Sequence, residues 1–213
     1  MGLVACALIV GAASLATAGI PDLTNSTASR AYTGPETLSL FSTPDGSGKP
    51  FSECFVVNGG GVVQDGTITL VVNDGLGVPI EFFPAADMWI SAGGTPGLVA
   101  CAGNFIANFN TNAAGETVWQ NALFAGGYST LVTRVYINGD ELTTAGYSGL
   151  ALNHNTPDIN ADGVVNLSDT GFFASDLFVG PYNFRSDYNA DGSINLTDAG
   201  FIGTNIGSAC PPR

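Results

Sequence analysis

The chain has 213 residues, of which 18 are acidic and 5 are basic, so its formal net charge at pH 7 is −13. So strong an excess of negative charge argues against nucleic acid and anionic lipid as partners. Only 11% of the residues are charged, 45% are hydrophobic and Gly is abundant, a balance that is typical of β-rich secreted modules and far from that of disordered chains.

The first 18 residues have the pattern of a signal peptide. Residues 3–18 form an uncharged apolar run that is too short to span a bilayer and ends in Ala16-Thr17-Ala18, a typical cleavage site. Leu3-Val4-Ala5-Cys6 is similar to a lipoprotein box, but the apolar run follows the cysteine instead of preceding it, which argues against lipidation. We therefore expect a secreted or extracellular protein, free or associated with the cell surface, with no membrane insertion.

The next segment, residues 19–34, is small and polar, as in a linker or an edge strand. From residue 35 to residue 150, short β-forming runs alternate with turn residues, and Asn138-Gly139 is the strongest hairpin signal. This spacing predicts one antiparallel β-sandwich of about 110 residues. The predicted strands are Thr37 to Ser42, Cys54 to Val57, Thr67 to Val72, Ile80 to Phe83, Met88 to Ser91, Phe105 to Phe109, Thr117 to Leu123, Thr130 to Ile137 and Glu141 to Thr144.

Three cysteines remain once the leader is removed, so one disulfide is possible. Cys54 and Cys101 fall within the predicted sandwich and are the favoured pair, although either could pair with Cys210 instead. Trp89 and Trp119 lie in otherwise apolar strands, which favours the core. The alternative is an aromatic platform for sugar rings, to which Tyr128, Tyr136 and Tyr147 would also belong.

Residues 151–157 are expected to form a hinge, and His154, the only histidine of the chain, is expected to be a solvated residue within it. With a single histidine, a Ser-His-Asp triad or a zinc site is almost excluded. The acidic residues of the predicted sandwich are scattered and offer no clear pair for glycoside hydrolysis. We therefore expect no catalytic residues and no enzymatic activity.

Two twelve-residue stretches near the C-terminus are one motif written twice. Positions 1, 3, 5, 9 and 12 are Asp, Asn, Asp, Asn and Asp, and position 6 is Gly. Oxygen ligands at this spacing, with a sharp turn at position 6 and a backbone carbonyl at position 7, are what a calcium loop of the EF-hand type requires. The sequence therefore predicts two Ca²⁺ sites. The expected ligands are Asp158, Asn160, Asp162, Val164, Asn166 and Asp169 in the first loop, and Asp187, Asn189, Asp191, Ser193, Asn195 and Asp198 in the second.

A helix is expected after each loop but before neither. Pro157 precedes the first loop, and residues 182–186 before the second lack a helical apolar period. Position 8, which is Val165 or Ile194, fits a short strand-like pairing between the loops. Apolar residues then predict one buried stripe on each exiting helix. The stripes comprise Leu167, Phe173 and Leu177 on the first helix, and Leu196, Ile202 and Ile206 on the second.

A duplicated calcium loop and helix, without entering helices and with Asp at position 12, resembles the dockerin type I module. The resemblance covers residues 158 to about 207 and implies a calcium-binding domain, residues 158–213, that docks to a cohesin-like extracellular protein. Dockerins present positions 10 and 11 of each loop, which are Leu167-Ser168 and Leu196-Thr197 here. The hydroxyl residues fit that interface, whereas the two leucines are expected to point into the core.

Phe172 and Phe201 recur at equivalent places in the two copies, either as a second layer of the core or as exposed anchors. Residues 72–80 and 111–117 are similar to the turn patterns of bacterial immunoglobulin-like domains. The expected fold class is therefore mostly β with a small α module: an immunoglobulin-like antiparallel β-sandwich followed by a dockerin-like tandem calcium-loop–helix domain.

The function implied by these resemblances is docking or assembly outside the cell by a secreted, non-catalytic protein that holds two structural calcium ions. One alternative is a self-associating subunit of an extracellular filament or surface layer that calcium stabilises. Another is a carbohydrate-binding module or a small glycan-active enzyme that acts as a component of a polysaccharide-degrading complex, with a glycan as its ligand.

Overall fold

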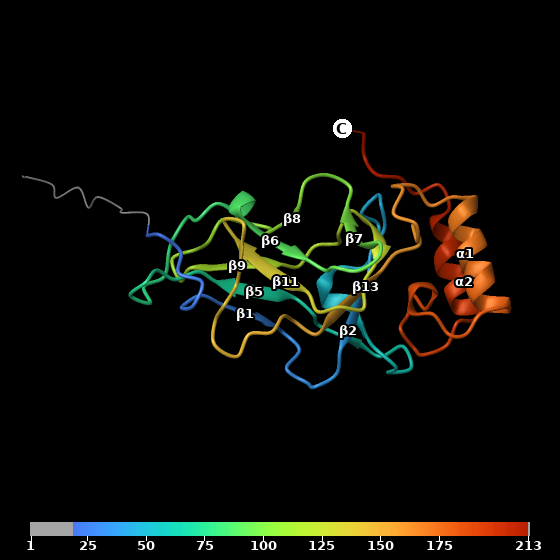
Figure 1. Ribbon diagram of the computed structural model, residues 1–213, viewed down its shortest axis with the longest axis horizontal. Coiled ribbons are helices and arrows are strands. Elements are labelled where there is room, and N and C mark those ends of the chain that lie inside the picture. Colours follow the sequence, from blue (N-terminus) through green and yellow to red (C-terminus); the bar gives the residue numbers. More distant parts are fainter. Residues whose placement is uncertain (1–18, 213) are drawn as a thin grey trace, which may run out of the picture.

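The chain is mostly β-structure with a small helical part at its C-terminal end, as expected from the sequence (Figure 1). The computed structural model describes residues 19–212, so the expected signal peptide lies outside the described residues. The strands are β1 Thr27–Arg30, β2 Leu38–Phe41, β3 Cys54–Val56, β4 Val63–Gln64, β5 Ile68–Val71, β6 Met88–Ser91, β7 Gly97–Ala100, β8 Phe105–Ile106, β9 Glu116–Trp119, β10 Ala125–Tyr128, β11 Arg134–Ile137, β12 Asp140–Glu141 and β13 Leu152–Asn155. The helices are α1 Leu167–Phe178 and α2 Leu196–Asn205, and 3-10 turns occur at Phe51–Glu53, Ala85–Asp87 and Phe184–Ser186.

The sandwich includes the sheet β13-β2-β3-β4 and the pair β10-β7, whose apolar residues join its main cluster. Its body consists of two antiparallel sheets, one with the order β1-β5-β9 and the other with the order β12-β11-β6-β8. Their inward residues alternate along each strand, as in Ile68 and Leu70 of β5 and Met88 and Ile90 of β6, and they share one apolar cluster. Trp119 is 1% exposed in this core, as expected, and its indole Nε1 donates a 2.8 Å hydrogen bond to the carbonyl of Phe105.

The expectation that Trp89 lies in the core is wrong. Because Met88 and Ile90 point inward, Trp89 between them lies on the outer face of β6, where it is only partly buried. Its ring stacks against that of Tyr136 on β11, with ring centroids 5.8 Å apart and an interplanar angle of 7°.

Several strands differ from the sequence expectation. Residues 80–83 form a turn in which Phe82 has φ of 61°, instead of the predicted strand. Strand β1 lies at the edge of the sheet β1-β5-β9, so it fulfils one of the two alternatives expected for residues 19–34. The strands β4, β7, β10 and β13 are outside the predicted set. β7 and β10 contain glycine, which weakens the β signal in a sequence, yet the two pair with each other along their length.

Residues 151–157, expected to be a hinge, contain strand β13. It pairs in parallel with β2, so that Leu152 lies opposite Leu38 and His154 opposite Leu40, in a sheet of order β13-β2-β3-β4. His154 also exchanges backbone hydrogen bonds with Ser129, which follows β10. The connection between the sandwich and the C-terminal part is therefore a strand, β13, that is hydrogen-bonded to neighbours on both sides.

The expectation of a solvated His154 is wrong, because the side chain is fully buried. Its Nε2 lies 2.8 Å from the hydroxyl oxygen of Thr133, and its Nδ1 has no hydrogen-bond partner. Burial lowers the pKa of His154 to about 3, so the ring stays neutral in the folded chain.

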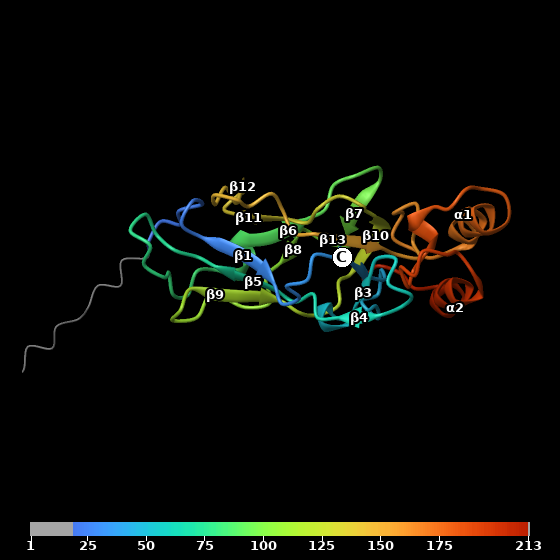
Figure 2. The same cartoon turned by 90° about the horizontal axis from the view of Figure 1, so that it is seen from below.

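A second apolar cluster combines residues of the sandwich with residues of the helical part. Phe41 of β2 and Phe55 of β3 pack in it with Phe173 of α1, Ile202 of α2 and Tyr188, which is 0% exposed. Both views show the two helices side by side at one end of the long axis, against the sheet that contains β2 and β3 (Figures 1 and 2). The sandwich and the helical pair therefore share a core.

The disulfide joins Cys101 to Cys210, 109 residues apart, so the expected pairing of Cys54 with Cys101 is wrong. Cys54 is free and buried on β3, and burial raises the pKa of its thiol to about 12. A neutral thiol in the core behaves as a small apolar side chain. Within residues 19–212, no helix combines the length and the apolar character needed to cross a bilayer.

Candidate metal centre

The first loop is organised around the carboxylate of Asp158, which is fully buried. Its Oδ1 accepts a hydrogen bond from the backbone N–H of Asp162 at 3.1 Å, and its Oδ2 accepts one from Gly163 at 2.9 Å. The chain can turn back in this way because Ala161 and Gly163 have φ of 59° and 91°. Position 6 thus needs the left-handed backbone region, where glycine carries no penalty.

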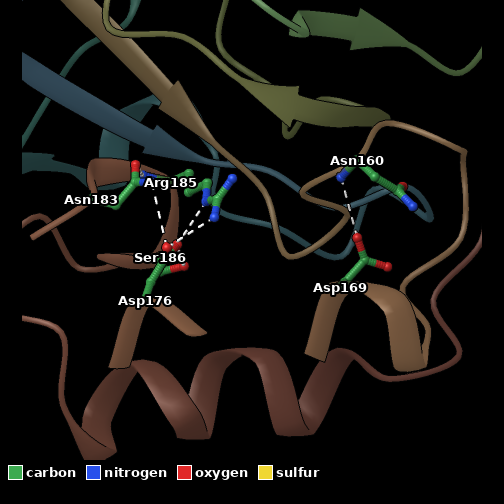
Figure 3. A network of polar contacts seen from close by, with 6 residues as sticks. All are labelled: Asn160, Asp169, Asp176, Asn183, Arg185 and Ser186. Atoms are coloured by element: carbon green, nitrogen blue, oxygen red, sulfur yellow. Dashed lines mark hydrogen bonds and ion pairs between the residues drawn. The ribbon is translucent and has the colours of Figure 1, made fainter. Parts of the chain in front are cut away.

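Helix α1 brings the last ligand position of the loop back to its start. Asn166 is the N-cap, whose side chain accepts a 2.7 Å hydrogen bond from the N–H of Ser168. Asp169, in the first turn, accepts a hydrogen bond from the backbone N–H of Asn166 at 2.9 Å. It also accepts one from the backbone N–H of Asn160 at 3.2 Å (Figure 3). A capping box therefore fixes the carboxylate at position 12.

Three carboxylates converge as a result. Oxygen atoms of Asp158, Asp162 and Asp169 lie within 4.8 Å of one another. Burial raises the pKa of Asp158 to about 6, and the nearby charges of Asp169 and Asp162 add to the rise. An all-oxygen donor set with a concentrated negative charge fits a hard divalent cation such as Ca²⁺ or Mg²⁺.

The second loop repeats the hydrogen bonds of the first. Asp187 accepts from the N–H of Asp191 at 3.1 Å and from that of Gly192 at 2.9 Å. Asp198 accepts from Asn195 at 3.0 Å, within a second capping box. Ala190 and Gly192 have φ of 51° and 93°. Equal sequence at equal spacing has thus produced nearly equal backbone geometry.

The second loop differs in what surrounds its first carboxylate. The hydroxyl of Tyr182 donates a 2.8 Å hydrogen bond to Oδ2 of Asp187, and the amide of Asn155 on β13 donates to the Asp187 carbonyl at 2.5 Å. Among residues 19–212, the first loop is where three carboxylates come within 4.8 Å. The two candidate sites are therefore not equivalent.

Both loops contact the sandwich directly. The N–H of Gly127 on β10 donates to the carbonyl of Asp158 at 2.7 Å, and a Cβ on Gly126 would collide with the Asp158 carboxylate. The N–H of Asn58 donates to the carbonyl of Ala190 in the second loop, also at 2.7 Å. Sequence reasoning missed these contacts, although the Gly126-Gly127 pair was a signal of close backbone approach.

An ion pair that sequence reasoning also missed joins α1 to the turn that precedes the second loop (Figure 3). The guanidinium of Arg185 donates to the carboxylate of Asp176 at 2.6 and 2.9 Å, and the hydroxyl of Ser186 donates to it at 2.7 Å. Burial alone would raise the pKa of Asp176, but these hydrogen bonds hold it below its usual value. The network fixes the second loop to the first helix.

Position 8 of the loops does not behave as expected. Val165 is buried, but its N–H donates to the carbonyl of Ser208 and its carbonyl accepts from Gly207, at 2.8 and 2.9 Å. The C-terminal segment thus takes the place that the sequence had suggested for the second loop. Ile194, the equivalent residue, packs at the edge of the shared apolar cluster.

The expectation that Leu167 and Leu196 point into the core is wrong, because each is 85% exposed. Each is the first residue of its helix, and the flanking N-cap Asn and first-turn Asp already face the loop. In the middle of the predicted stripes, Phe173 and Ile202 are buried as expected. Ile206, at the end of the second stripe, is 59% exposed.

The repeated phenylalanines have different surroundings. Phe201 packs in the shared core, with its ring centroid 4.9 Å from that of Phe41. Phe172 is 40% exposed, and the guanidinium of Arg185 lies 5.2 Å from its ring centroid. Phe201 is therefore a second layer of the core, whereas Phe172 lies at the surface.

Comparison with known proteins leaves the chain without a family. No family model matches it, and no curated protein matches it. A solved structure described as the crystal structure of the Lin-41 filamin domain is similar with a TM-score of 0.30 and 8% sequence identity, over 62% of this chain and 95% of that one. A likeness of this size supports no conclusion about function.

Proposed function

We propose that this chain is a secreted, non-catalytic protein whose two loops bind structural Ca²⁺ and whose helical pair docks to another extracellular protein. The observation that carries the proposal is the convergence of the Asp158, Asp162 and Asp169 carboxylates within 4.8 Å. Bound Ca²⁺ would neutralise most of the charge of each loop. The twelve ligand positions expected from the sequence would supply side-chain oxygens and, at Val164 and Ser193, carbonyl oxygens.

Calcium is proposed to act on stability and shape. An empty loop holds three like charges close together, and this repulsion opposes the fold that the capping boxes and the shared core favour. A ligand that binds only the folded chain, present at about a hundred times its dissociation constant, adds about 2.7 kcal/mol per site to the free energy of unfolding. The loops would then hold α1 and α2 in a fixed position against the sandwich.

The exposed ends of the two helices support docking. Leu167 and Leu196 are large apolar residues at equivalent positions of the repeat, each 85% exposed, and the hydroxyl residues Ser168 and Thr197 are exposed beside them. Exposed apolar residues with polar neighbours are typical of partner contacts. The resemblance to dockerins names the partner class as a cohesin-like protein, with the sandwich, proposed to be immunoglobulin-like, as the attached module.

Isothermal titration of the full chain with CaCl₂ tests the metal sites. We expect two binding events in the parent, one in Asp158→Ala, one in Asp187→Ala and none in the double variant. Asp140→Ala, which removes an exposed carboxylate on β12, outside both loops, is the control and should keep both events. A parent chain that takes up no Ca²⁺ would refute the proposal.

A pull-down with purified cohesin domains, in CaCl₂ and in EDTA, tests docking. Binding should need Ca²⁺ and should be lost in the double variant Leu167→Asp, Leu196→Asp. The control Leu131→Asp, which changes a 55% exposed leucine of the sandwich, should bind like the parent. Equal capture of the double variant and the parent would exclude the helix ends as the contact.

A second candidate function, binding of a neutral polysaccharide, is favoured by the outer face of the sandwich. Ile106, Trp89 and Tyr136 lie opposite one another on β8, β6 and β11, so one cross-strand row carries an apolar and aromatic surface. Such rows stack against sugar rings. The chain should then be retained on insoluble cellulose or chitin, and Trp89→Ala should release it. Passage of the parent through both columns would remove this candidate.

A further inference from the structure

The C-terminal segment, residues 207–210, lies along the middle of the first loop. Besides its two hydrogen bonds with Val165, it donates one from the N–H of Cys210 to the carbonyl of Gly163 at 2.8 Å. Val164, between these two loop residues, forms an antiparallel bridge with Ala209. Positions 6, 7 and 8 of the loop are therefore paired with the segment as in a short two-stranded ladder.

The disulfide ties this ladder to the sandwich. Cys101, at the end of β7, donates its backbone N–H to Phe124 at 3.0 Å and carries the covalent link to Cys210. The Cys210 sulfur is so close to the loop that a Cβ on Gly163 would lie 3.3 Å from it. Without the disulfide, a few hydrogen bonds at the end of the chain would have to hold the ladder together against fraying.

The segment therefore contacts the part of the loop that contains or orients two of the proposed metal ligands. The carbonyl of Val164 is the expected ligand at position 7, and the N–H of Gly163 holds the carboxylate of Asp158 in place. Both groups belong to the stretch that the segment pairs with. In the second loop, the corresponding Gly192 lies against the side chain of Asn58. The two loops have matching internal hydrogen bonds but differ in the residues that pack against them from outside.

We infer that the Cys101–Cys210 disulfide and residues 207–210 position the first loop for Ca²⁺, so that breaking the disulfide weakens the first site and leaves the second unchanged. The inference rests on the proposed function, since it concerns the affinity of those same loops. Loss of groups that orient metal ligands typically reduces metal affinity about 10–100-fold. Oxidation of the cysteine pair would thus strengthen the first site selectively.

Nuclear magnetic resonance of the intact chain separates the two sites. The amide signals of Gly163 and Gly192 report the first and second loop, and each is followed during a CaCl₂ titration of the oxidised and of the reduced protein. We expect reduction to raise the midpoint at Gly163 about tenfold or more and to leave that at Gly192 within about twofold. The inference would be overturned if the titration midpoint at Gly163 were the same in the two redox states. It would also be overturned if reduction changed the midpoints at Gly163 and Gly192 by the same factor.

A reciprocal measurement covers the case in which reduction disturbs the fold. Coupling between two equilibria acts in both directions, so Ca²⁺ must protect the disulfide from dithiothreitol by the same factor. Protection should persist in Asp187→Ala and vanish in Asp158→Ala. Protection that depends equally on both loops, or on neither, would contradict the inference. Absence of any response to Ca²⁺ at both glycines would instead refute the proposed calcium function.

Discussion

The rings of Phe41 and Phe201 meet edge to face, with centroids 4.9 Å apart and an interplanar angle of 63°. Phe41 belongs to β2 and Phe201 to α2, so this contact lies where the sheet meets the helical pair. Edge-to-face contacts and burial together make such aromatic pairs strong. The two loops that are proposed to bind Ca²⁺ are therefore attached to the sandwich by a common apolar core as well as by the chain.

The first prediction concerns this shared core. Phe41→Ala should lower the free energy of unfolding by about 3–5 kcal/mol, because Phe41 is 4% exposed and its loss leaves a cavity. Urea unfolding followed by far-ultraviolet and near-ultraviolet circular dichroism measures the change. Phe178→Ala, at an 80% exposed position of α1, is the control and should have little effect. Two separate transitions in the parent would contradict a shared core.

The second prediction concerns the effect of removing the metal. EDTA should lower the melting temperature of the parent, and the loss should grow with the CaCl₂ concentration used as reference, since the ligand stabilises by mass action. The helical signal should persist at low temperature, because Phe173 of α1 and Ile202 of α2 pack in an apolar cluster with Phe41 and Phe55 of the sheet. Differential scanning calorimetry measures this. An identical melting temperature with and without EDTA would count against structural calcium.

A pair of glycine substitutions separates close packing from helix propensity. Gly126→Ala should weaken Ca²⁺ binding by the first loop, because the added methyl group would meet the Asp158 carboxylate. Gly171→Ala lies within α1, has open space around the new methyl group and should stabilise the chain by about 0.5–1 kcal/mol. Calcium titration and urea unfolding of both variants provide the comparison. Unchanged calcium affinity in Gly126→Ala would show that the loop does not need the close contact between the backbone of Gly126 and the Asp158 carboxylate.

The ion pair between α1 and the second loop can be compared with one on the sandwich surface. Arg185→Ala should cost about 1–3 kcal/mol, because it leaves the Asp176 carboxylate, with a 7% exposed side chain, short of donors. Arg134→Ala breaks the pair with Glu141, whose side chains are 45% and 33% exposed, and should cost at most about 1 kcal/mol. Urea unfolding at neutral pH measures both. A larger loss of unfolding free energy in Arg134→Ala than in Arg185→Ala would contradict the prediction.

The last prediction follows from the buried histidine. The pKa of His154 is about 3 in the folded chain, against an ordinary value of 6.5, so below pH 6.5 the unfolded chain binds a proton that the folded chain refuses. Stability should therefore fall as the pH drops from 6.5 towards 3, by about 1.4 kcal/mol per pH unit from this group. The control is His154→Gln. Unfolding between pH 7 and 5 should show a steeper loss in the parent, and equal slopes would contradict the prediction.

Features that depend on neighbouring residues could be predicted from the sequence. The turns at Gly163 and Gly192 and the helices that begin at Leu167 and Leu196 follow from the spacing of Asx residues within twelve positions. Such side chains bond to backbone groups only a few residues away, so no distant contact is needed to form them. The β-forming run from Thr67 to Val72 likewise predicted β5, because β-branched residues between turn residues are a local signal.

Features that depend on distant segments were decided by the tertiary structure. Cys210 met Cys101 because the C-terminal segment pairs with the first loop, and sequence spacing carries no information about that proximity. His154 is buried because β13 fits between β2 and the chain after β10, although its own neighbours are polar. The loop motif and its local geometry are thus properties of the sequence, whereas the attachment of the two loops to the sandwich arises from packing between segments that only the folded chain brings together.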